Sequence, residues 1–260
     1  MMEGTPNPAT WSSGSAGEFE GRSVLVTGAA SGIGRFMAEA FAARGATVYA
    51  ADLHSVSASP TSSIIPLVMR VEDDDAIAAA MSSIADRSGR LDVLFNAAGV
   101  HSPQVWGTLK RPRVDRVFAI NTVGAMMVLQ AAARLMVKSG GGRIVNVSSI
   151  AGRTGGAPAA YCASKAAVIS MTQSAARAYA ADGIRVNAIA PGPISTQMWS
   201  RIREGTDNLS LFDREMLALT PLARLGEPAD LKAVTMLLAS ERSAHITGRT
   251  FNIDGGMTMK

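Results

Sequence analysis

The stretch S-V-L-V-T-G-A-A-S-G-I-G, residues 23–34, decides the fold of this chain. Its first residues, Ser23–Val26, predict a short buried strand, and the run after the last glycine predicts a helix. Between them Gly28 permits a tight turn, Gly32 removes a side chain where a phosphate would approach, and Gly34 lets the helix lie close to the strand. The N-terminus of such a helix offers free N–H groups and a positive dipole end to an anion. The stretch therefore predicts the phosphate-binding turn of a dinucleotide site.

The next predicted strand, Thr47–Ala51, ends at Asp52. A carboxylate at this point can accept hydrogen bonds from both hydroxyls of an adenosine ribose, and it would repel a 2′-phosphate. Asp52 therefore predicts NAD rather than NADP as the cofactor. Arg35, directly after the glycines, would favour NADP, but its helical position is expected to face solvent or the pyrophosphate.

Short apolar segments alternate with longer Ala-rich helical patterns along the rest of the chain, without a linker or a repeat. This order predicts one α/β domain over residues 21–260, with a parallel sheet of about seven strands and helices on both faces. Residues 1–20 are rich in Gly, Ser, Thr and Pro and predict a flexible N-terminal leader. The remaining strands are expected at Ile64–Val68, Leu91–Phe95, Arg143–Val147, Ile184–Ala190 and Thr250–Ile253.

Composition argues against several classes of function. The chain has 260 residues, 47% of them hydrophobic, which is enough for a large core. Its one cysteine, Cys162, excludes an internal disulfide and fits a reducing compartment such as the cytoplasm. No apolar run reaches the ~18 residues of a membrane span, and the N-terminus lacks the order of a signal peptide. The net charge of +4 is scattered along the chain, which argues against nucleic acid as a partner.

A tyrosine and a lysine stand four residues apart in the stretch from Gly142 to Ala167. This stretch predicts a buried strand that ends in two serines, a Gly-rich loop, and a helix that opens on Tyr161 and Lys165. On a helix both side chains project from one face. A cation about 4–6 Å away could lower the pKa of a tyrosine by about 1–3 units, into the range of an acid–base catalyst. The same spacing also occurs on ordinary helix surfaces. The other motifs of the chain therefore decide whether this pair is interpreted as catalytic.

Three further features are expected near this pair. Asn121 interrupts a long apolar helix pattern over Val114–Val137, so its amide is expected to face the sheet and to need a partner. The loop His101–Pro112, with Trp106, is expected to form a substrate wall at the same edge. His101 could donate a proton there, although a lone loop histidine is more often merely exposed. Residues 195–222 form a polar, Arg-rich excursion of the right size for a substrate lid.

Together, in this order and at these spacings, the motifs resemble the short-chain dehydrogenase/reductase family over essentially everything after residue 21. The stretch from the serines to the lysine and the Ala-Pro-Gly turn are also similar to the polyol and sugar dehydrogenases of that family. The resemblance implies a Rossmann-type, doubly wound sheet and a homotetramer. It is carried by the glycine turn, Asp52, N-A-A-G at 96–99, Asn121, Ser148 and Ser149, Y-C-A-S-K at 161–165, P-G-P-I-S-T from Pro191, and D-G-G at 254–256.

The resemblance implies a catalytic tetrad of Asn121, Ser149, Tyr161 and Lys165. Tyr161 would be the general base in alcohol oxidation and the general acid in carbonyl reduction. Lys165 would lower the pKa of Tyr161 and hold the nicotinamide ribose, Ser149 would bind the substrate oxygen, and Asn121 would fix a water. No metal is implied. The implied cofactor-binding residues are Gly28, Ser31, Gly32, Ile33, Gly34, Asp52, Leu53, Val71, Asn96, Ala98, Tyr161, Lys165, Ile194 and Thr196.

The chain departs from the family pattern at three places. Counting 13 residues back from Tyr161 gives Ser148 as the catalytic serine, whereas aligning S-x-A-G gives Ser149. Strand alternation allows only one of the two to face the site, and we take Ser149. Ala97 replaces an asparagine that is frequent in the family. Arg70-Val71 stands where Asp-Val often holds the adenine amine.

Three functions are compatible with these features. The first is an NAD-dependent oxidoreductase that acts on a secondary alcohol or its ketone. A polyol or a sugar-like molecule is one candidate for this substrate. The second is a 3-oxoacyl-thioester reductase, which would use NADPH and which Asp52 opposes. The third is a non-catalytic nucleotide-binding protein on the same fold. Such proteins typically lack the tyrosine or the lysine, and this chain has both Tyr161 and Lys165.

Overall fold

Seven parallel strands form one sheet, in the order β3-β2-β1-β4-β5-β6-β7, in the computed structural model, which describes residues 17–56, 63–204 and 209–259. Every pair of neighbouring strands in this order runs parallel. The predicted α/β fold with about seven parallel strands is therefore confirmed. The strands are β1 (Ser23–Thr27), β2 (Thr47–Asp52), β3 (Ile64–Val68), β4 (Val93–Asn96), β5 (Gly142–Val147), β6 (Ile184–Pro191) and β7 (Thr250–Ile253).

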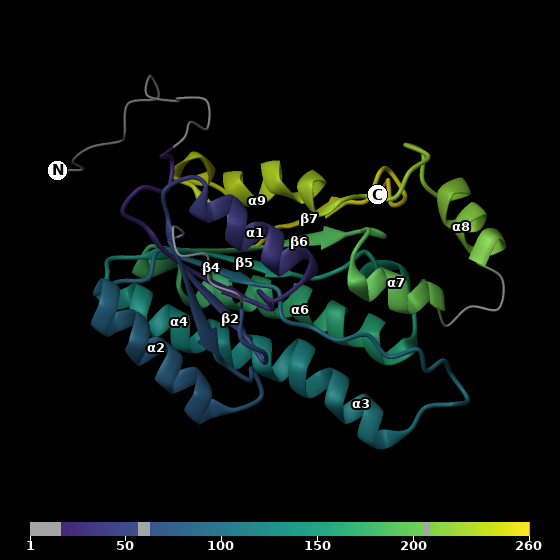
Figure 1. Ribbon diagram of the computed structural model, residues 1–260, viewed down its shortest axis with the longest axis horizontal. Helices are drawn as coiled ribbons and strands as arrows, with labels where there is room; N and C mark the ends of the chain where they lie inside the picture. Colours follow the sequence, from purple (N-terminus) through teal and green to yellow (C-terminus); the bar gives the residue numbers. More distant parts are fainter. Residues whose placement is uncertain (1–16, 57–62, 205–208, 260) are drawn as a thin grey trace.

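Helices connect the strands and cover both faces of the sheet. They are α1 (Gly32–Ala42), α2 (Asp74–Ser88), α3 (Arg111–Phe118), α4 (Ala125–Lys138), α5 (Ala151–Thr154), α6 (Ala159–Ala178), α7 (Gln197–Glu204), α8 (Leu209–Ala218) and α9 (Lys232–Ala239). A π-helix, η2 (Ala119–Gly124), joins α3 to α4, and short 3₁₀ helices are η3 (Ala180–Asp182), η4 (Pro228–Leu231) and η5 (Glu241–Ser243). Figure 1 shows α1 and α9 on one face of the sheet and α2, α4 and α6 on the other.

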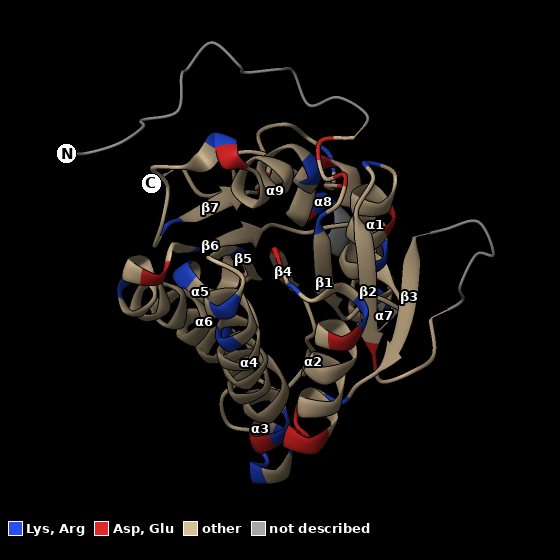
Figure 2. Cartoon of the chain, turned by 90° about the vertical axis from the view of Figure 1, so that its left-hand side faces the viewer, with Lys and Arg blue, Asp and Glu red and all other residues tan. Residues whose placement is uncertain are grey.

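An apolar core lies on each face of the sheet. Successive side chains of a strand point to opposite faces. Leu25 of β1 accordingly joins the core beneath α2, α4 and α6, whereas Val24 and Val26 join the core beneath α1 and α9. Because both faces are covered, the strands are apolar along their length instead of alternating with polar residues. Figure 2 shows that the charged residues lie mainly on the helices and loops, whereas the strands are mostly uncharged.

The ordered fold begins before the first strand. Phe19 is 2% exposed, and its ring meets the ring of Phe41 edge to face, with 5.1 Å between the centroids. The backbone N–H of Phe19 also donates to the carbonyl of Arg44. The predicted leader over residues 1–20 is therefore wrong at residues 17–20, because one aromatic side chain in a Gly- and Ser-rich stretch is enough to anchor it. The rest of that prediction lies outside the described residues.

The helix Arg111–Lys138, made of α3, η2 and α4, is long and apolar enough to span a membrane by length and composition. The predicted helix pattern over Val114–Val137 lies within it, but charged residues keep its longest apolar run shorter than a membrane span. Its mean hydropathy is 1.4 over an 18-residue window, and 56% of that window is buried inside the protein. Val128, Leu129 and Met136 on this helix belong to the core. This burial is typical of the core helix of a soluble protein.

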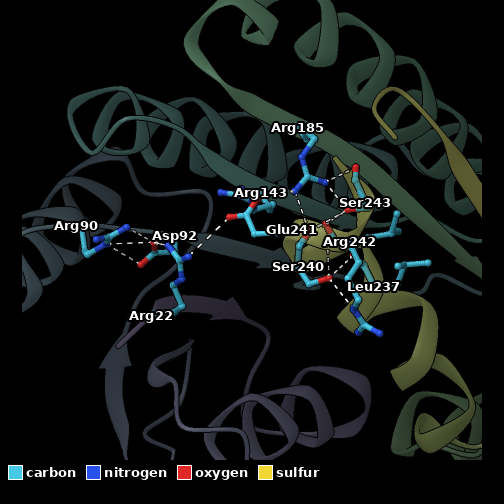
Figure 3. A network of polar contacts seen from close by, with 11 residues as sticks. Arg22, Arg90, Asp92, Arg143, Arg185, Leu237, Ser240, Glu241, Arg242 and Ser243 are labelled. Carbon is cyan, nitrogen blue, oxygen red and sulfur yellow. Dashed lines mark hydrogen bonds and ion pairs between the residues drawn. The ribbon is translucent and has the colours of Figure 1, made fainter. Parts of the chain in front are cut away.

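A network of arginines and carboxylates ties the amino-terminal edge of the sheet together (Figure 3). Asp92, just before β4, accepts hydrogen bonds from Arg22 and Arg90. Burial opposes its ionisation, but the hydrogen bonds outweigh burial and hold the pKa of Asp92 below its usual 3.8. Glu241, after α9, forms ion pairs with Arg22 and Arg143. The network therefore links β1, β4 and β5 to the end of α9.

The strand order reverses between β1 and β4. The chain proceeds from β1 to β2 and β3 on one side, and from β4 to β7 on the other. Loops that leave the carboxyl ends of β1 and β4 therefore diverge, and ligands of doubly wound sheets bind in the crevice at such a point. The glycine turn follows β1 and the N-A-A-G motif follows β4, so the fold brings both predicted motifs to this place.

Candidate active site

The glycine turn after β1 leaves no room for side chains. Gly28 has φ +69°, and a Cβ atom there would lie 3.0 Å from the backbone of Ala98. A Cβ atom on Gly34 would lie 2.1 Å from the carbonyl oxygen of Gly28. Ser31 is the N-cap of α1 but makes no side-chain capping bond, so the hydroxyl does not occupy the first N–H groups of the helix. These features fit an approaching pyrophosphate.

Asp52 lies beside this turn, at the carboxyl end of β2. One carboxylate oxygen accepts the N–H of Ala30 at 3.0 Å, and the other accepts the N–H of His54 at 3.2 Å. The carboxylate is therefore fixed by the turn itself, on the side where an adenosine ribose would follow the phosphates. Leu53, the next residue, is exposed. Arg35 is also exposed and pairs with Glu39 at 3.0 Å, as predicted from its helical position.

Hydrogen bonds within the protein hold the N-A-A-G motif after β4 in place. The hydroxyl of Thr27 accepts the N–H groups of Ala97 and Ala98, each at 3.0 Å, and donates to the side-chain carbonyl of Asn96 at 3.1 Å. The amide nitrogen of Asn96 donates to the carbonyl of Ala125 at 2.9 Å. The side chain of Asn96 is therefore occupied within the protein, and a contact from Asn96 to a cofactor would have to come from its backbone.

Val71 contributes to the core. It is 7% exposed, and its carbonyl oxygen would lie 2.7 Å from a Cβ atom on Gly124. Its side chain packs into the core and would not be available to a bound adenine. Arg70 pairs with Glu72 at the surface, at 3.2 Å.

The loop after β6 reaches back to the glycine turn. Ile194 is buried and forms an isolated bridge with Gly226. The methyl carbon of Thr196 would lie 3.4 Å from a Cβ atom on Gly32. Two of the implied cofactor-binding residues, Ile194 and Thr196, thus lie at the same edge of the sheet as the glycine turn. Within the described residues, α7 and α8 occupy most of the predicted lid.

Tyr161 and Lys165 lie side by side at the start of α6, as their spacing predicts. The Nζ atom of Lys165 is 5.8 Å from the centroid of the Tyr161 ring. Lys165 is 4% exposed, and its Nζ donates to the carbonyl of Val147 at the end of β5, at 2.9 Å. The ammonium is thus held between helix and sheet, over the phenol ring.

The predicted lowering of the Tyr161 pKa is wrong for the protein without a bound ligand. Burial raises the pKa of Tyr161 to about 12, although a hydrogen bond with Ser149 opposes the rise. Burial also lowers the pKa of Lys165 to about 8, so the amine is protonated at neutral pH but loses its proton only slightly above it. Desolvation disfavours the charged form of each group, and it is the largest cause of both shifts. Tyr161 is therefore a neutral phenol near neutral pH and carries the proton that carbonyl reduction would use.

The two serines after β5 face in different directions. Ser149 forms a side-chain hydrogen bond with Tyr161; its Oγ also accepts the N–H of Ala151 at 3.2 Å and lies 3.5 Å from the carbonyl oxygen of Pro191. Ser148 is 2% exposed, and its Oγ donates to the backbone carbonyl of Lys165 at 2.8 Å. The structure thus places Ser149 beside the phenol, while Ser148 anchors α6 to the sheet.

Asn121 lies in the π-helix η2, where its amide is fixed by the chain after β4. Its Oδ1 accepts the N–H of Val100 at 2.8 Å, and its Nδ2 donates to the carbonyl of Val100 at 2.9 Å. The expected partner for a buried amide therefore exists. A Cβ atom on Gly99 would lie 3.3 Å from Oδ1 of Asn121 and 3.4 Å from Nζ of Lys165, so the small residue keeps this space open.

His101, expected to be merely exposed, is half-buried, and the partners of Thr27 and Gly99 were not predicted. The ring of His101 lies 5.2 Å from that of Tyr161, centroid to centroid. Nothing local marks this contact, because it joins the loop after β4 to α6. The glycine of N-A-A-G and the threonine before the turn were part of recognised motifs, but their partners come from distant parts of the chain.

These residues fit a nicotinamide dinucleotide. The side-chain-free cradle at Gly28 and Gly34 suits a pyrophosphate, Asp52 suits a ribose, and the phenol of Tyr161 lies at the same sheet edge. When bound, such a cofactor supplies the hydride and, in its oxidised form, a positive charge. Among the described residues no group of three or more His, Cys, Asp or Glu side chains could hold a metal ion.

Known proteins resemble this chain over nearly its whole length. A family model described as Enoyl-(Acyl carrier protein) reductase matches residues 28–258. Sorbitol dehydrogenase from Cereibacter sphaeroides is 38% identical over 252 residues, which cover 92% of this chain and 98% of that protein. The 3-oxoacyl-(acyl-carrier-protein) reductase FabG from Thermotoga maritima is 36% identical over 249 residues, covering 92% and 99%.

The fold has similar solved structures. A short-chain type dehydrogenase/reductase from Mycobacterium marinum superimposes with a TM-score of 0.85 and 30% identity, over 94% of this chain and 98% of that one. The chain therefore belongs to the short-chain dehydrogenase/reductase family of oxidoreductases.

Proposed function

We propose that this protein is an NAD-dependent dehydrogenase that transfers a hydride between nicotinamide and a secondary alcohol or its ketone, with a polyol or sugar-like substrate. The observation that carries the proposal is the position of Tyr161. Its phenol contacts Ser149 and Lys165 at the sheet edge that also holds the glycine turn. A proton donor beside a hydride site is what carbonyl reduction requires.

In the proposed reaction Tyr161 donates its proton to the carbonyl oxygen during reduction and takes it back during alcohol oxidation. Ser149 donates a hydrogen bond to the same oxygen, whose negative charge grows as the hydride arrives. The ammonium of Lys165 stabilises the phenolate that remains. Asn121, fixed by Val100, keeps the chain after β4 in place beside Lys165.

The choice of cofactor rests on Asp52. Its carboxylate is held by Ala30 and His54, so it cannot easily turn away from a neighbouring 2′-phosphate. This arrangement favours NAD and opposes the alternative, a 3-oxoacyl-thioester reductase that uses NADPH. The likeness to sorbitol dehydrogenase supports a polyol substrate, while the comparable likeness to FabG supports the alternative. The non-catalytic alternative is disfavoured because both Tyr161 and Lys165 are present and adjacent.

The proposal is tested with the purified protein and four assays. NAD and NADP are each supplied with a panel of polyols and simple secondary alcohols, and NADH and NADPH with the matching ketones and a 3-oxoacyl thioester. Reduction or oxidation of the cofactor is followed by nicotinamide absorbance. Turnover of polyols with NAD is the expected result. A strong preference for NADPH and the thioester would establish the alternative, and binding of a dinucleotide without any turnover would establish the non-catalytic function.

Replacing Asp52 with Asn is expected to raise the ratio of kcat/KM with NADP to kcat/KM with NAD by about tenfold or more. The amide is the same size and still accepts the N–H of Ala30, but it no longer repels a phosphate. Steady-state kinetics with both cofactors measures the ratio. Asp86→Asn, on the exposed face of α2, is the matched control and should leave the ratio unchanged. An unchanged ratio in Asp52→Asn would show that Asp52 does not determine the choice between NAD and NADP.

The two serines provide a matched pair of variants. Ser149→Ala is expected to lower kcat by about a hundredfold, because a donor to the developing oxyanion is lost. Ser148→Ala is expected to affect stability instead, by about 0.5–1.5 kcal/mol, because the buried hydrogen bond from Ser148 to the backbone of α6 is lost. Kinetics and urea unfolding of both variants separate the two effects. If Ser148→Ala were the variant with the larger loss of kcat, the assignment of Ser149 would be wrong.

We also propose that the protein is a homotetramer and that it works in the cytoplasm. Its partner is a small-molecule substrate, and neither nucleic acid nor a membrane is proposed as a partner. Family resemblance supports the tetramer, and the one cysteine supports a reducing compartment. Light scattering on the eluting protein measures the oligomer directly, and a monomer would remove this part of the proposal.

A further inference from the structure

An imidazole lies against the phenol that the proposed reaction uses. His101, two residues after N-A-A-G, has its ring centroid 5.2 Å from that of Tyr161, with an angle of 57° between the ring planes. This distance is in the range of direct contact between aromatic rings. His101 comes from the loop after β4, and Tyr161 comes from α6, so the contact spans the crevice between the two elements.

The nitrogens of this imidazole are available. Within the described part of the chain, neither ring nitrogen of His101 has a hydrogen-bond or ion-pair partner, and neither is among the fully buried atoms that lack one. The residue is half-buried, and burial lowers the pKa of His101 below 6.5. Near neutral pH the ring is therefore uncharged and presents one donor and one acceptor.

The loop that carries His101 is held in shape. Gln104 is buried, its Nε2 donates to the carbonyl of Thr108 at 2.9 Å, and its Oε1 accepts the N–H of Lys110 at 3.3 Å. On its other side, Val100 is clamped by both amide atoms of Asn121. His101 thus stands between two fixed points, as a residue with a directional binding role must.

We propose that His101 binds a second oxygen of the substrate, on the carbon next to the reacting one. The reacting oxygen must meet the hydroxyl of Tyr161, so the neighbouring carbon enters the space that the imidazole borders. The site would then favour vicinal diols and α-hydroxy ketones over simple secondary alcohols and ketones. This inference rests on the proposed function and narrows its substrate class.

A purely structural role for His101 would be to cover the face of Tyr161. The variants separate the two roles because phenylalanine keeps an aromatic ring at this contact but has no nitrogen. His101→Phe therefore tests the hydrogen bond with the packing retained. His101→Asn and His101→Gln place an amide near the Nδ1 and Nε2 positions respectively, so rescue by one of them would identify the nitrogen that binds.

The experiment compares acetoin with butanone, which differ only in the hydroxyl next to the carbonyl. With NADH, the ratio of kcat/KM for acetoin to that for butanone is expected to fall about tenfold in His101→Phe, and to recover in part in one of the amide variants. An unchanged ratio, with or without an equal loss on both ketones, would overturn the inference and leave the proposed function standing. If no ketone or alcohol of the wider panel is turned over, the proposed function itself fails.

A second measurement does not depend on turnover. The chain has three histidines, so the proton NMR spectrum contains few imidazole signals, and the one missing in His101→Phe is His101. In Tyr161→Phe protein with NADH, addition of acetoin is expected to shift this signal, whereas butanone at the same concentration shifts it less. Equal shifts with both ketones, or no shift with either at concentrations that saturate binding, would contradict a hydrogen bond to the second oxygen.

Discussion

Tyr161→Phe is expected to lower turnover by about a thousandfold, in both directions of the reaction. The substitution removes one hydroxyl, which contacts Ser149, and keeps the ring that lies beneath the ammonium of Lys165. The other two tyrosines are Tyr49 in β2 and Tyr179 at the far end of α6, so neither is placed to replace the lost proton donor. Steady-state kinetics with saturating cofactor measures the loss.

Cofactor binding is the control for this variant. Titration with NADH, followed by its fluorescence, should give a Kd within a few-fold of the unmodified protein, since the glycine turn and Asp52 are untouched. Tyr179→Phe, at the other end of α6, is the matched tyrosine variant and should turn over normally. Turnover of Tyr161→Phe within tenfold of the unmodified protein would show that the phenol is not the acid–base group.

The pH dependence follows from the direction of the pKa shift. With a pKa of about 12 in the ligand-free protein, Tyr161 is protonated throughout the neutral range. Carbonyl reduction uses this form directly, so its rate should not rise with pH above neutrality. Alcohol oxidation needs the phenolate, so its kcat/KM should rise with pH until the apparent pKa is reached. The positive charge of the oxidised nicotinamide would bring that apparent pKa below 12. A rise in both directions, or in neither, would contradict this account.

The architecture could be predicted because its signals are local. The apolar runs at Ile64–Val68 and Thr250–Ile253 coincide with β3 and β7, since a strand buried on both faces must be apolar along its length. Asn121 could be assigned to the interior because an amide among apolar neighbours needs a partner, and it has one. Its position in a π-helix could not be predicted, because the extra residue in the turn depends on packing against α6.

The errors share a physical cause. Phe19 belongs to the core although its neighbours in sequence are typical of a leader, because its partner Phe41 comes from α1. The four residues of α5 form a helical turn within a stretch that predicts a Gly-rich loop. The pKa of Tyr161 rises because desolvation depends on everything packed around the ring, and spacing along a helix reveals only the lysine. Burial is a property of the assembled fold, and local patterns do not contain it.

Lys165→Met is expected to abolish most activity and, at the same time, to stabilise the ligand-free protein at pH 7 by about 1–3 kcal/mol. The protonated amine is buried, and burial lowers its pKa from 10.5 to about 8. This shift corresponds to a cost of about 3 kcal/mol in the folded state wherever the lysine is charged in both states. Methionine has a similar shape and no charge to desolvate, and it forfeits only the hydrogen bond to Val147 at 2.9 Å.

The sign of this effect can be checked with pH. Below about pH 8 the amine is protonated in both the folded and the unfolded chain, so the full cost is present. Between pH 8 and 10.5 the unfolded chain still binds the proton and the folded protein does not, so stability rises with pH. The advantage of Lys165→Met should therefore shrink as the pH rises from 7 to 10. Urea unfolding of the ligand-free proteins, at one protein concentration, measures it.

Lys138→Met, at the exposed end of α4, is the control for the loss of a lysine, and its stability difference should not change with pH. A Lys165→Met protein that is less stable at pH 7, or a stability difference that is constant with pH, would show that the ammonium is not strained by burial. A destabilising charge persists in a fold only where something else requires it. The gain in stability from the same substitution that removes activity would therefore be direct evidence that Lys165 is kept for function and not for stability.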